Sequence, residues 1–263
     1  MITSVSNKKV KQIVQWQTRS KDRKKDGIFL AEGFKMFEEA PKELICEVYL
    51  SEDAAQKAEQ SKDGIWNKLQ QTGFETVTGE VFERMSDTRT PQGILTVLKQ
   101  PSYRLEDLLE LNNGLYVILE NLQDPGNLGT IIRTGEGAGI TGVIMSRQTV
   151  DLFNPKTIRS TMGSIYRVPF VYTDDLAGVI ALMQQKGIRC YAAHLKGSTY
   201  YDSLSFKEPT AFMIGNEGNG LSDEIASKAD AYLKIPMEGS VESLNASIAT
   251  ALLIYEAHRQ RQQ

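Results

Sequence analysis

The stretch that decides the fold runs from residue 115 to residue 145 and reads LYVILENLQDPGNLGTIIRTGEGAGITGVIM. It begins with LYVILE (Leu115–Glu120), an unbroken apolar run typical of parallel strands that are buried on both faces. A loop and a helix are expected over Asn121–Ala138, and a second apolar run, GVIM, follows at Gly142–Met145. Strand, helix and strand joined by short connections predict a parallel sheet covered by helices.

The same alternation continues to the end of the chain. Further strands are expected at VPFVY, IRCYAAHL, FMIG and AYLKIPM, and further helices near residues 155–162, 174–186, 222–228 and 245–259. Such a βα alternation is typical of an α/β domain in which helices cover both faces of the sheet. We therefore predict one α/β domain over residues 114–263.

The first hundred residues predict a smaller α/β unit of their own. Helices are expected at 7–18, 34–40 and 52–71, and strands at GIFLAEG, LICEVYL and GILTVLK. Pro101 interrupts both strand and helix, so the segment that ends at Tyr103 is interpreted as a linker. The predicted first domain is therefore 1–103.

Composition excludes several classes of protein. With 41% hydrophobic and 24% charged residues among 263, the chain is typical of a globular protein. No apolar run reaches the roughly 18–20 residues that span a bilayer, and the charged N-terminus is unlike a secretory signal, so a cytoplasmic protein without membrane contact is expected. The two cysteines, Cys46 and Cys190, form no CxxC pair, so neither a disulfide framework nor a metal site is expected.

Charge is distributed unevenly. Residues 1–25 hold eight Lys or Arg and one acid, a net charge of +7, whereas the whole chain is at −3, so the remainder carries −10. A basic arm on an acidic body favours contact with a polyanion such as RNA, and a solvated helix face is the alternative. The contact is expected to rest on a cluster of four residues, Lys21, Arg23, Lys24 and Lys25.

Two glycine-rich segments are candidates for ligand sites. TGEGAGI (Thr134–Ile140) falls at the end of a helix rather than after a strand, so it does not support a dinucleotide-binding fingerprint. GNEGNGLS (Gly215–Ser222) follows a strand but lacks the Gly-Lys-Ser/Thr of a P-loop. A tight turn explains its glycines, yet a ligand crevice is favoured because such crevices lie at the carboxyl ends of parallel strands.

Three stretches carry a family resemblance: Asn121–Ile140, Phe212–Leu221 and Ile235–Leu253. Together they resemble the three motifs of the SpoU (TrmH-like) family of RNA ribose 2′-O-methyltransferases, in the family's order, and NPKTIRSTMGSIYRVP (Asn154–Pro169) fits as well. RKKDGIFLAEG and TPQGILTV resemble the family's substrate-binding domain. The resemblance implies a SPOUT-type fold in which the C-terminal part of the parallel sheet is tied into a trefoil knot. It also implies S-adenosylmethionine as methyl donor and a homodimer.

The resemblance implies catalytic roles for five polar residues: Asn127, Arg133, Glu217, Ser243 and Asn245. Arg133 would be the main one. A guanidinium stays protonated, with a pKa above about 12, so binding a phosphate and stabilising the developing alkoxide suits Arg133 better than acting as a base. Arg133, phosphate and water all remain open as the proton acceptor. Helix capping is the alternative role for Asn127, Ser243 and Asn245.

The cofactor positions that the resemblance implies are Gly215, Ile235, Met237 and Leu244. Backbone groups would recognise the nucleoside there, and core packing is the alternative for Ile235 and Met237. The last helix, Asn245–Arg259, is apolar on more than one face, which favours a two-fold dimer interface over intramolecular burial alone.

The predicted function is methylation of a ribose 2′-hydroxyl in RNA. Ribosomal (23S) RNA is favoured over transfer RNA because a separate front domain is present. The alternatives are a transfer-RNA enzyme and a non-catalytic RNA-binding or ribosome-assembly factor on the same scaffold. An NAD-dependent enzyme comes third, since the glycine context does not fit one.

Overall fold

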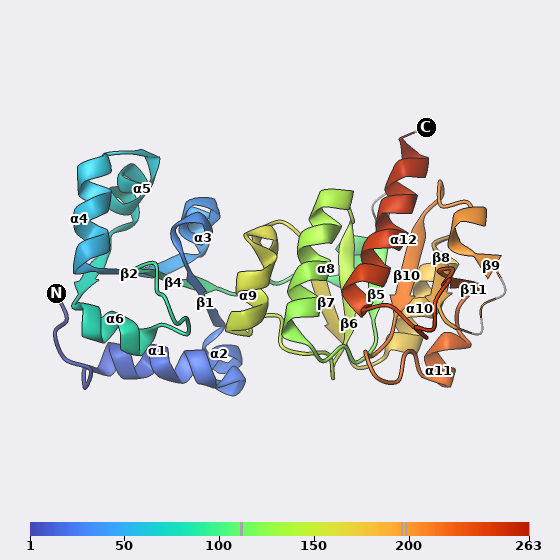
Figure 1. The fold of residues 1–263 in the computed structure, drawn as a ribbon, viewed down its shortest axis with the longest axis horizontal. Helices are drawn as coiled ribbons and strands as arrows, with labels where there is room; N and C mark the ends of the chain where they lie inside the picture. Colours follow the sequence, from blue (N-terminus) through green and yellow to red (C-terminus); the bar gives the residue numbers. More distant parts are fainter. Residues whose placement is uncertain (111–112, 196, 198, 263) are drawn as a thin grey trace. The chain divides into compact units, whose positions relative to one another are not determined.

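The structure, a computed structural model, describes residues 1–110, 113–195, 197, 199–262. Its contacts divide the chain into two compact units (Figure 1). Unit 1 comprises residues 1–101 and 151–166, and unit 2 comprises residues 102–150 and 167–263. The segment 151–166 thus groups with the front of the chain, although its sequence lies inside the predicted domain 114–263. The division into a substrate-binding and a catalytic domain stays a prediction, because compact units describe packing rather than function.

Unit 1 is built on a mixed sheet in the order β1-β4-β2-β3 among its described residues. β4 is antiparallel to β1 and to β2, and β3 is parallel to β2. The strands are β1 (Ile28–Glu32), β2 (Ile45–Ser51), β3 (Glu75–Val77) and β4 (Ile94–Lys99). The helices are α1 (Lys8–Thr18), α2 (Ser20–Asp26), α3 (Phe34–Glu39), α4 (Glu52–Ser61), α5 (Gly64–Thr72), α6 (Gly79–Met85) and α9 (Pro155–Thr161), with the 3-10 turns η1 (Lys42–Leu44) and η2 (Ser164–Tyr166).

Each face of this sheet packs against its own helices, because successive side chains of a strand point to opposite faces. Tyr49 of β2 faces the cluster that includes Val10 and Ile13 of α1 and residues of α6. Its neighbour Leu50 faces the cluster that includes Leu69 of α5 and residues of α3 and α4. The alternating pattern of β2 therefore places the sheet between two helical layers.

The predicted helix 52–71 is wrong in one respect, because it is two helices. α4 ends at Ser61, and its C-cap Lys62 has a left-handed φ of 48° that closes the helix. Asp63 then begins α5, its side chain accepting hydrogen bonds from the backbone N–H groups of Ile65 and Trp66. The apolar periodicity continues through residues 52–71 and gives no sign of a break. The break is made by a residue with left-handed backbone followed by a carboxylate that caps the next helix.

The basic arm is not a free arm, since its residues form α1 and α2. Arg23 is buried, with 2% of its surface exposed. Its guanidinium lies 2.6 Å from the carboxylate of Asp151 and donates to the backbone oxygens of Trp16 and Gln17. The expectation that Arg23 contacts RNA is therefore wrong, because a buried and paired guanidinium is not available to phosphate. Lys21, Lys24 and Lys25 are exposed, and their contact with RNA stays a prediction.

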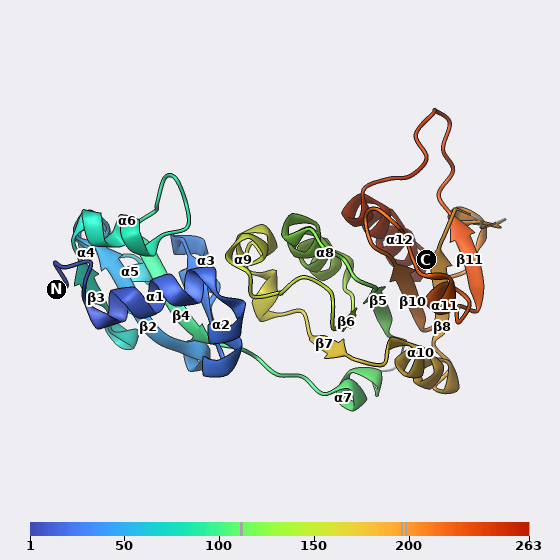
Figure 2. The same ribbon diagram turned by 90° about the horizontal axis from the view of Figure 1, so that it is seen from below.

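Unit 2 is built on a sheet in which every pairing between described strands is parallel, in the order β7-β6-β5-β10-β8-β11-β9 (Figure 2). The strands are β5 (Leu115–Leu119), β6 (Gly142–Ser146), β7 (Phe170–Thr173), β8 (Arg189–Ala193), β9 (Thr199–Tyr200), β10 (Thr210–Ile214) and β11 (Ala231–Lys234). The helices are α7 (Leu105–Leu109), α8 (Pro125–Ala138), α10 (Leu176–Gln185), α11 (Asp223–Ala226) and α12 (Ala246–Arg261), with the 3-10 turn η3 (Tyr201–Ser203). The predicted parallel α/β sheet is confirmed, and the trefoil knot stays a prediction.

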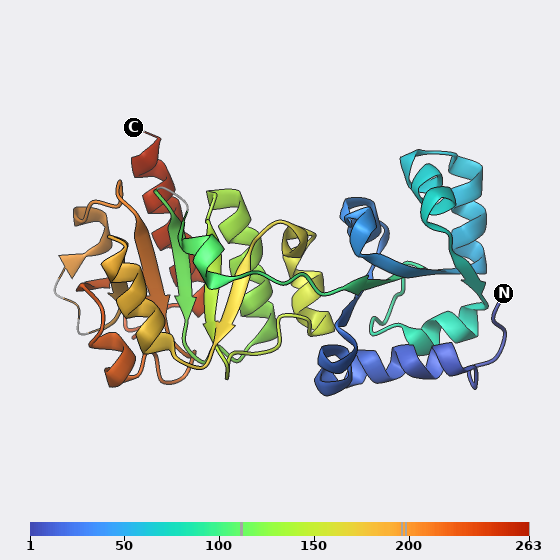
Figure 3. The ribbon, with the colours of Figure 1, turned by 180° about the vertical axis from the view of Figure 1, so that it is seen from behind.

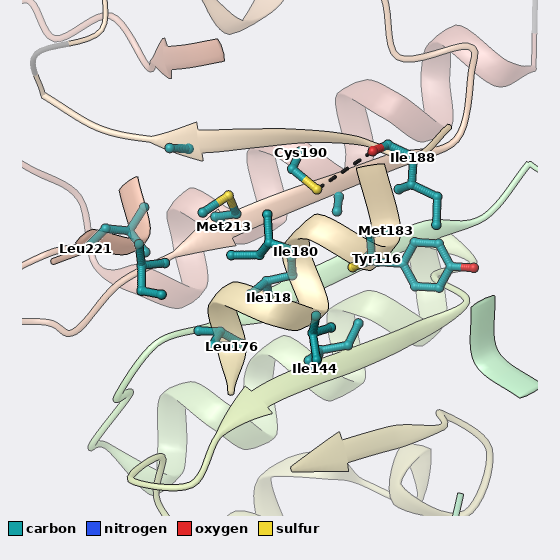
Figure 4. Close-up of a cluster of buried hydrophobic side chains, with 14 of the residues drawn as sticks. Tyr116, Ile118, Ile144, Leu176, Ile180, Met183, Ile188, Cys190, Met213 and Leu221 are labelled. Carbon is teal, nitrogen blue, oxygen red and sulfur yellow. Dashed lines mark hydrogen bonds between the residues drawn. The ribbon is translucent and has the colours of Figure 1, made fainter. Parts of the chain in front are cut away.

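Helices cover both faces of this sheet. α8 and α12 pack on each other and lie on one face (Figure 1), and α10 lies across the other (Figure 3). Figure 4 shows the core beneath α10, where Ile180 and Met183 of that helix meet Ile118 of β5 and Ile144 of β6. All five residues of β5 are buried, as its continuous apolar run predicts.

Several short elements escaped the sequence analysis, among them α2, α6, α7, β3 and β9. Each spans seven residues or fewer, which is shorter than the roughly 11–18 residues over which helical periodicity can be judged. In the described part of the chain, no helix is both long and apolar enough to cross a membrane.

Candidate functional site

The site lies where the strand order of unit 2 reverses. β5 pairs with β6, which follows it in the chain, and on its other side with β10, about ninety residues away, with Leu119 opposite Ile214. The loops that leave the carboxyl ends of β5 and β10 therefore lie side by side. Open α/β sheets bind ligands in the crevice at such a switch point.

Glu217, on the loop after β10, is held by the loop after β5. Its carboxylate accepts hydrogen bonds from the backbone N–H of Asp124 (2.9 Å), the backbone N–H of Gln123 (3.0 Å) and the side-chain amide of Asn127 (3.0 Å). Burial raises the pKa of Glu217, but these hydrogen bonds outweigh it, so the pKa lies below its ordinary value. Glu217 is therefore a carboxylate at neutral pH.

A second hydrogen bond joins this pair to the last helix. The side-chain oxygen of Asn127 accepts from the side-chain amide of Asn245, at 2.9 Å. Asn245 is also the N-cap of α12, its side-chain oxygen accepting from the backbone N–H of Ser247 and of Ile248. Asn245 thus caps α12, and its catalytic role stays a prediction. A chain of contacts, Glu217–Asn127–Asn245, connects the three sequence motifs.

Asn127 is not a helix cap. α8 begins at Pro125, and Asp124 is its N-cap, accepting from the backbone N–H of Asn127 at 2.7 Å. Proline at the first helical position is favoured because its missing N–H would have no partner in the helix. Because α8 begins three residues earlier than a cap at Asn127 would require, the side chain of Asn127 is free to contact Glu217 and Asn245.

The loop Gly215–Ser222 is preformed by contacts that the sequence analysis missed. Asn216 donates to the backbone oxygen of Asn121 (2.9 Å) and accepts from the backbone N–H of Gly218 and Asn219. Glu120, buried at the end of β5, accepts from the backbone N–H and the hydroxyl of Ser222 at 2.7 and 2.6 Å. The sequence signal that could have identified Glu120 is an acidic residue directly after an apolar strand.

Gly215 has a steric reason to be glycine. A Cβ at this position would lie 2.0 Å from the carbonyl carbon of Gly220, where the two ends of the loop meet. Any side chain would force the loop open.

The loop borders a cavity of about 640 Å³, a volume in the usual range for small-molecule sites. All four predicted cofactor residues line it: Gly215, Ile235, Met237 and Leu244. Glu217 and Ser243 line it too, as do His194 and Leu195, which the sequence analysis did not assign to the site. The long loop between β11 and α12, which carries Ser243, is visible in Figure 2. Asn127 and Asn245 reach this cavity through Glu217.

Arg133 is not brought to the cavity. It lies on the exposed side of α8, and its guanidinium makes no hydrogen bond or ion pair with any residue that the structure describes. Within the same described residues, no three His, Cys, Asp or Glu side chains are grouped so that they could hold a metal ion. The site therefore offers an ionised carboxylate, two amides, a hydroxyl and a nucleoside-sized cavity, with an unpaired guanidinium outside it.

Comparison with known proteins gives the context for this geometry. Residues 114–255 match the model of the SpoU rRNA Methylase family, and residues 7–96 match an MRM3-like substrate binding domain. The chain is 32% identical over 255 residues to the 23S rRNA (guanosine(2553)-2′-O)-methyltransferase RlmP of Bacillus subtilis (strain 168). The aligned region covers 97% of this chain and 97% of that protein.

Solved structures are similar over nearly the whole chain. An AdoMet-bound rRNA methyltransferase from Sinorhizobium meliloti superposes with a TM-score of 0.84 and 32% identity, covering 98% of this chain and 97% of that one. The SpoU methyltransferase AviRb from Streptomyces viridochromogenes superposes with a TM-score of 0.83 and 25% identity, covering 97% and 98%.

Proposed function

Because this chain belongs to the SpoU rRNA methylase family, we propose that it transfers a methyl group from S-adenosylmethionine to a ribose 2′-hydroxyl in 23S rRNA. The observation that carries the proposal is the hydrogen-bonded chain Glu217–Asn127–Asn245 beside a nucleoside-sized cavity. The Bacillus subtilis relative, which matches both units at full length, supports ribosomal RNA as the substrate.

The cavity fits the methyl donor. Ile235, Met237 and Leu244 offer apolar surface for a flat base, and the loop at Gly215 lets a ligand approach backbone N–H and C=O groups closely. When bound, S-adenosylmethionine supplies a methyl group that its sulfonium already activates. The residues of the chain then have to hold and polarise the acceptor hydroxyl.

Three requirements fall on the protein: near-attack geometry, stabilisation of the developing negative charge, and removal of a proton. Glu217 fixes the amide of Asn127, which in turn fixes Asn245, so these groups are oriented before substrate arrives. Ser243, exposed on the cavity wall, offers a hydroxyl to the ribose. We assign Asn127, Ser243 and Asn245 to positioning the ribose, and Glu217 to holding Asn127 and, through it, Asn245.

Arg133 completes the site from a second copy of the chain. α12 exposes three large apolar side chains at helical spacing, Ile248, Leu252 and Tyr255, and we call them the α12 stripe. A two-fold dimer through this stripe covers it. Gly137 of α8 lies close to the stripe, because a Cβ at this glycine would be 2.8 Å from the hydroxyl of Tyr255. Arg133 lies one helical turn before Gly137 on the same side of α8, so it lies beside the stripe as well. In the dimer, Arg133 binds an RNA phosphate at the partner's site and stabilises the alkoxide.

The first test is methyl transfer from labelled S-adenosylmethionine to 23S rRNA, followed by mass spectrometry of the nucleosides. Arg133→Ala should lose on the order of 10²-fold or more in turnover while keeping cofactor affinity, because one transition-state contact is removed. Arg133→Lys should fail as well, since Lys lacks the planar bidentate fork. Near-normal turnover of Arg133→Ala with saturating RNA would contradict the assignment.

The second test mixes Arg133→Ala with Glu217→Ala subunits. If Arg133 acts across the dimer, a mixed dimer has one intact site, and activity returns on mixing two inactive proteins. If Arg133 acts within its own subunit, every site in the mixture is defective and activity stays absent.

Mapping ribose methylation in ribosomal and transfer RNA from cells with and without the gene decides the substrate.

A further inference from the structure

Unit 1 contains a groove of its own, of about 450 Å³, between α1, α6 and the N-terminal segment. Its lining residues are Val5, Ser6, Lys11, Val14, Gln15 and Arg84. The two valines make its surface apolar, and Val5 is 42% exposed. The volume is within the roughly 300–1,000 Å³ range of small-ligand sites.

The cations of this groove are unpaired. Lys11 and Arg84 are exposed and come from different helices, and their side chains make no hydrogen bond or ion pair with the described part of the chain. Lys9, two residues before Lys11 on α1, contrasts with them because it pairs with Glu75 at 3.1 Å and Glu47 at 3.6 Å. Among the described residues that line the groove, none is acidic. A groove that combines an apolar surface with two free cations suits a flat apolar ligand that also carries negative charge.

We propose that this groove binds one unstacked nucleobase of single-stranded RNA, with Lys11 and Arg84 on the phosphates that flank it. The inference rests on the proposed RNA methyltransferase function and specifies how unit 1 holds the substrate. Proteins read RNA sequence mainly in single-stranded loops, where bases leave the stack and lie on apolar or guanidinium surfaces. The side-chain amide of Gln15, which has no partner among the described residues, provides a donor and an acceptor for the base edge.

A duplex does not meet these requirements, because its bases are stacked inside the helix and only its phosphates and sugars are presented. An extended peptide would need an acidic partner for Lys11 and Arg84 and is less well matched than a nucleotide. Single-stranded RNA supplies both the flat base and the flanking charge.

The test measures affinity for a fluorescent single-stranded oligouridylate of about twelve nucleotides, with a duplex of equal length beside it. The full-length protein is used, from roughly 50 to 200 mM salt. The double variant Lys11→Ala/Arg84→Ala should weaken single-strand binding about tenfold and flatten the slope of log K against log salt by about 1.4, because each single-strand phosphate contact contributes about 0.7. Val5→Asp, which places a negative charge at an exposed position of the groove, should weaken binding to a similar extent.

Lys9→Ala is the matched control, since it removes one charge from the same helix but from a residue already paired with acids. It should leave the slope unchanged. A 4-thiouridine in the oligonucleotide should cross-link to the peptide that contains Val14 and Gln15. Thermal unfolding and cofactor affinity should be unchanged in every variant, because the cofactor cavity is built from unit 2.

Three results would overturn the inference: an unchanged slope in the double variant, an equal loss in Lys9→Ala, or duplex binding that matches single-strand binding. Methyl transfer to rRNA by the unsubstituted protein is measured in parallel. If it occurs while the groove variants bind RNA normally, only the groove inference fails. If it is absent while the groove still selects single strands, the proposed reaction fails and the groove stands.

Discussion

At the scale of single residues, Arg23 and Glu217 are charged groups whose partners come from distant parts of the chain. Arg23 of α2 is 3% exposed at its side chain and pairs with Asp151, which is 12% exposed. Ser20 also donates to Asp151, at 2.7 Å. The pair joins the segment 151–166 to the first helices of unit 1.

Replacing Asp151 by Ala should lower the free energy of unfolding of unit 1 by about 3–5 kcal/mol, because it leaves a buried guanidinium without its counter-charge. Urea unfolding followed by tryptophan fluorescence reports this unit alone, since both tryptophans, Trp16 and Trp66, lie in it. Arg19→Ala, which removes an exposed pair with Asp22 at 3.9 Å, is the control and should change stability by less than about 1 kcal/mol. Equal effects of the two substitutions would contradict the buried-pair interpretation.

The lowered pKa of Glu217 predicts how the stability of the folded protein changes with pH. A carboxyl whose folded pKa is below its ordinary 4.5 contributes stability that is present above 4.5 and lost as pH falls through the folded value. Asn127→Ala removes one hydrogen-bond donor, so the pKa of Glu217 should rise toward 4.5, and the stability that this group contributes should be smaller and fully lost at a higher pH. Carbon-13 NMR titration of the Glu217 carboxyl measures the shift directly. Asn219→Ala, on the same loop, should leave this pKa where it is.

At the scale of elements, the first residues of α8 and the N-cap of α12 belong both to the helix starts and to the proposed site. Asn245 caps α12 with its side-chain oxygen and donates to Asn127 with its amide nitrogen. Helix start and site geometry therefore depend on two different atoms of one side chain, and the two roles can be separated by substitution.

Asn245→Asp keeps a capping oxygen and places a negative charge at a helix N-terminus, so the melting temperature should be unchanged. It removes the amide that donates to Asn127 and adds a charge near Glu217, so methyl transfer should fall sharply. Asn245→Ala should lose activity and about 1 kcal/mol of stability. Calorimetry and single-turnover methylation of both variants check this separation; an active Asn245→Asp would show that the amide has no part in the site.

At the scale of the whole molecule, two neighbouring leucines of α12 distinguish folding from assembly. Leu253 has no exposed surface, whereas Leu252 is 38% exposed within the α12 stripe. The proposed homodimer needs Leu252, and the folded subunit needs Leu253.

Leu252→Glu should yield folded monomers without methyl transfer activity, because the charge lies on the subunit surface but inside the proposed interface. Leu253→Glu should destabilise the subunit itself by several kcal/mol, because it buries an unpaired charge. Light scattering together with circular dichroism separates the two outcomes. A monomeric unsubstituted protein at micromolar concentration would contradict the dimer.

Local pattern was enough to predict the α/β alternation, the buried strand at Leu115–Leu119 and the loop at Gly215–Ser222, whereas the family resemblance indicated the four residues Gly215, Ile235, Met237 and Leu244 that line the cavity. Periodicity and motif spacing are properties of neighbouring residues, which the amino-acid sequence contains directly. Tertiary structure alone decided that Arg23 is buried against Asp151, that Asn127 faces Glu217 rather than capping α8, and that Arg133 lies outside the cavity. Burial and pairing of charges depend on contacts between residues far apart in the sequence. These contacts form only when β5 pairs with β10 and the segment 151–166 packs in unit 1, and no local sequence pattern predicts them.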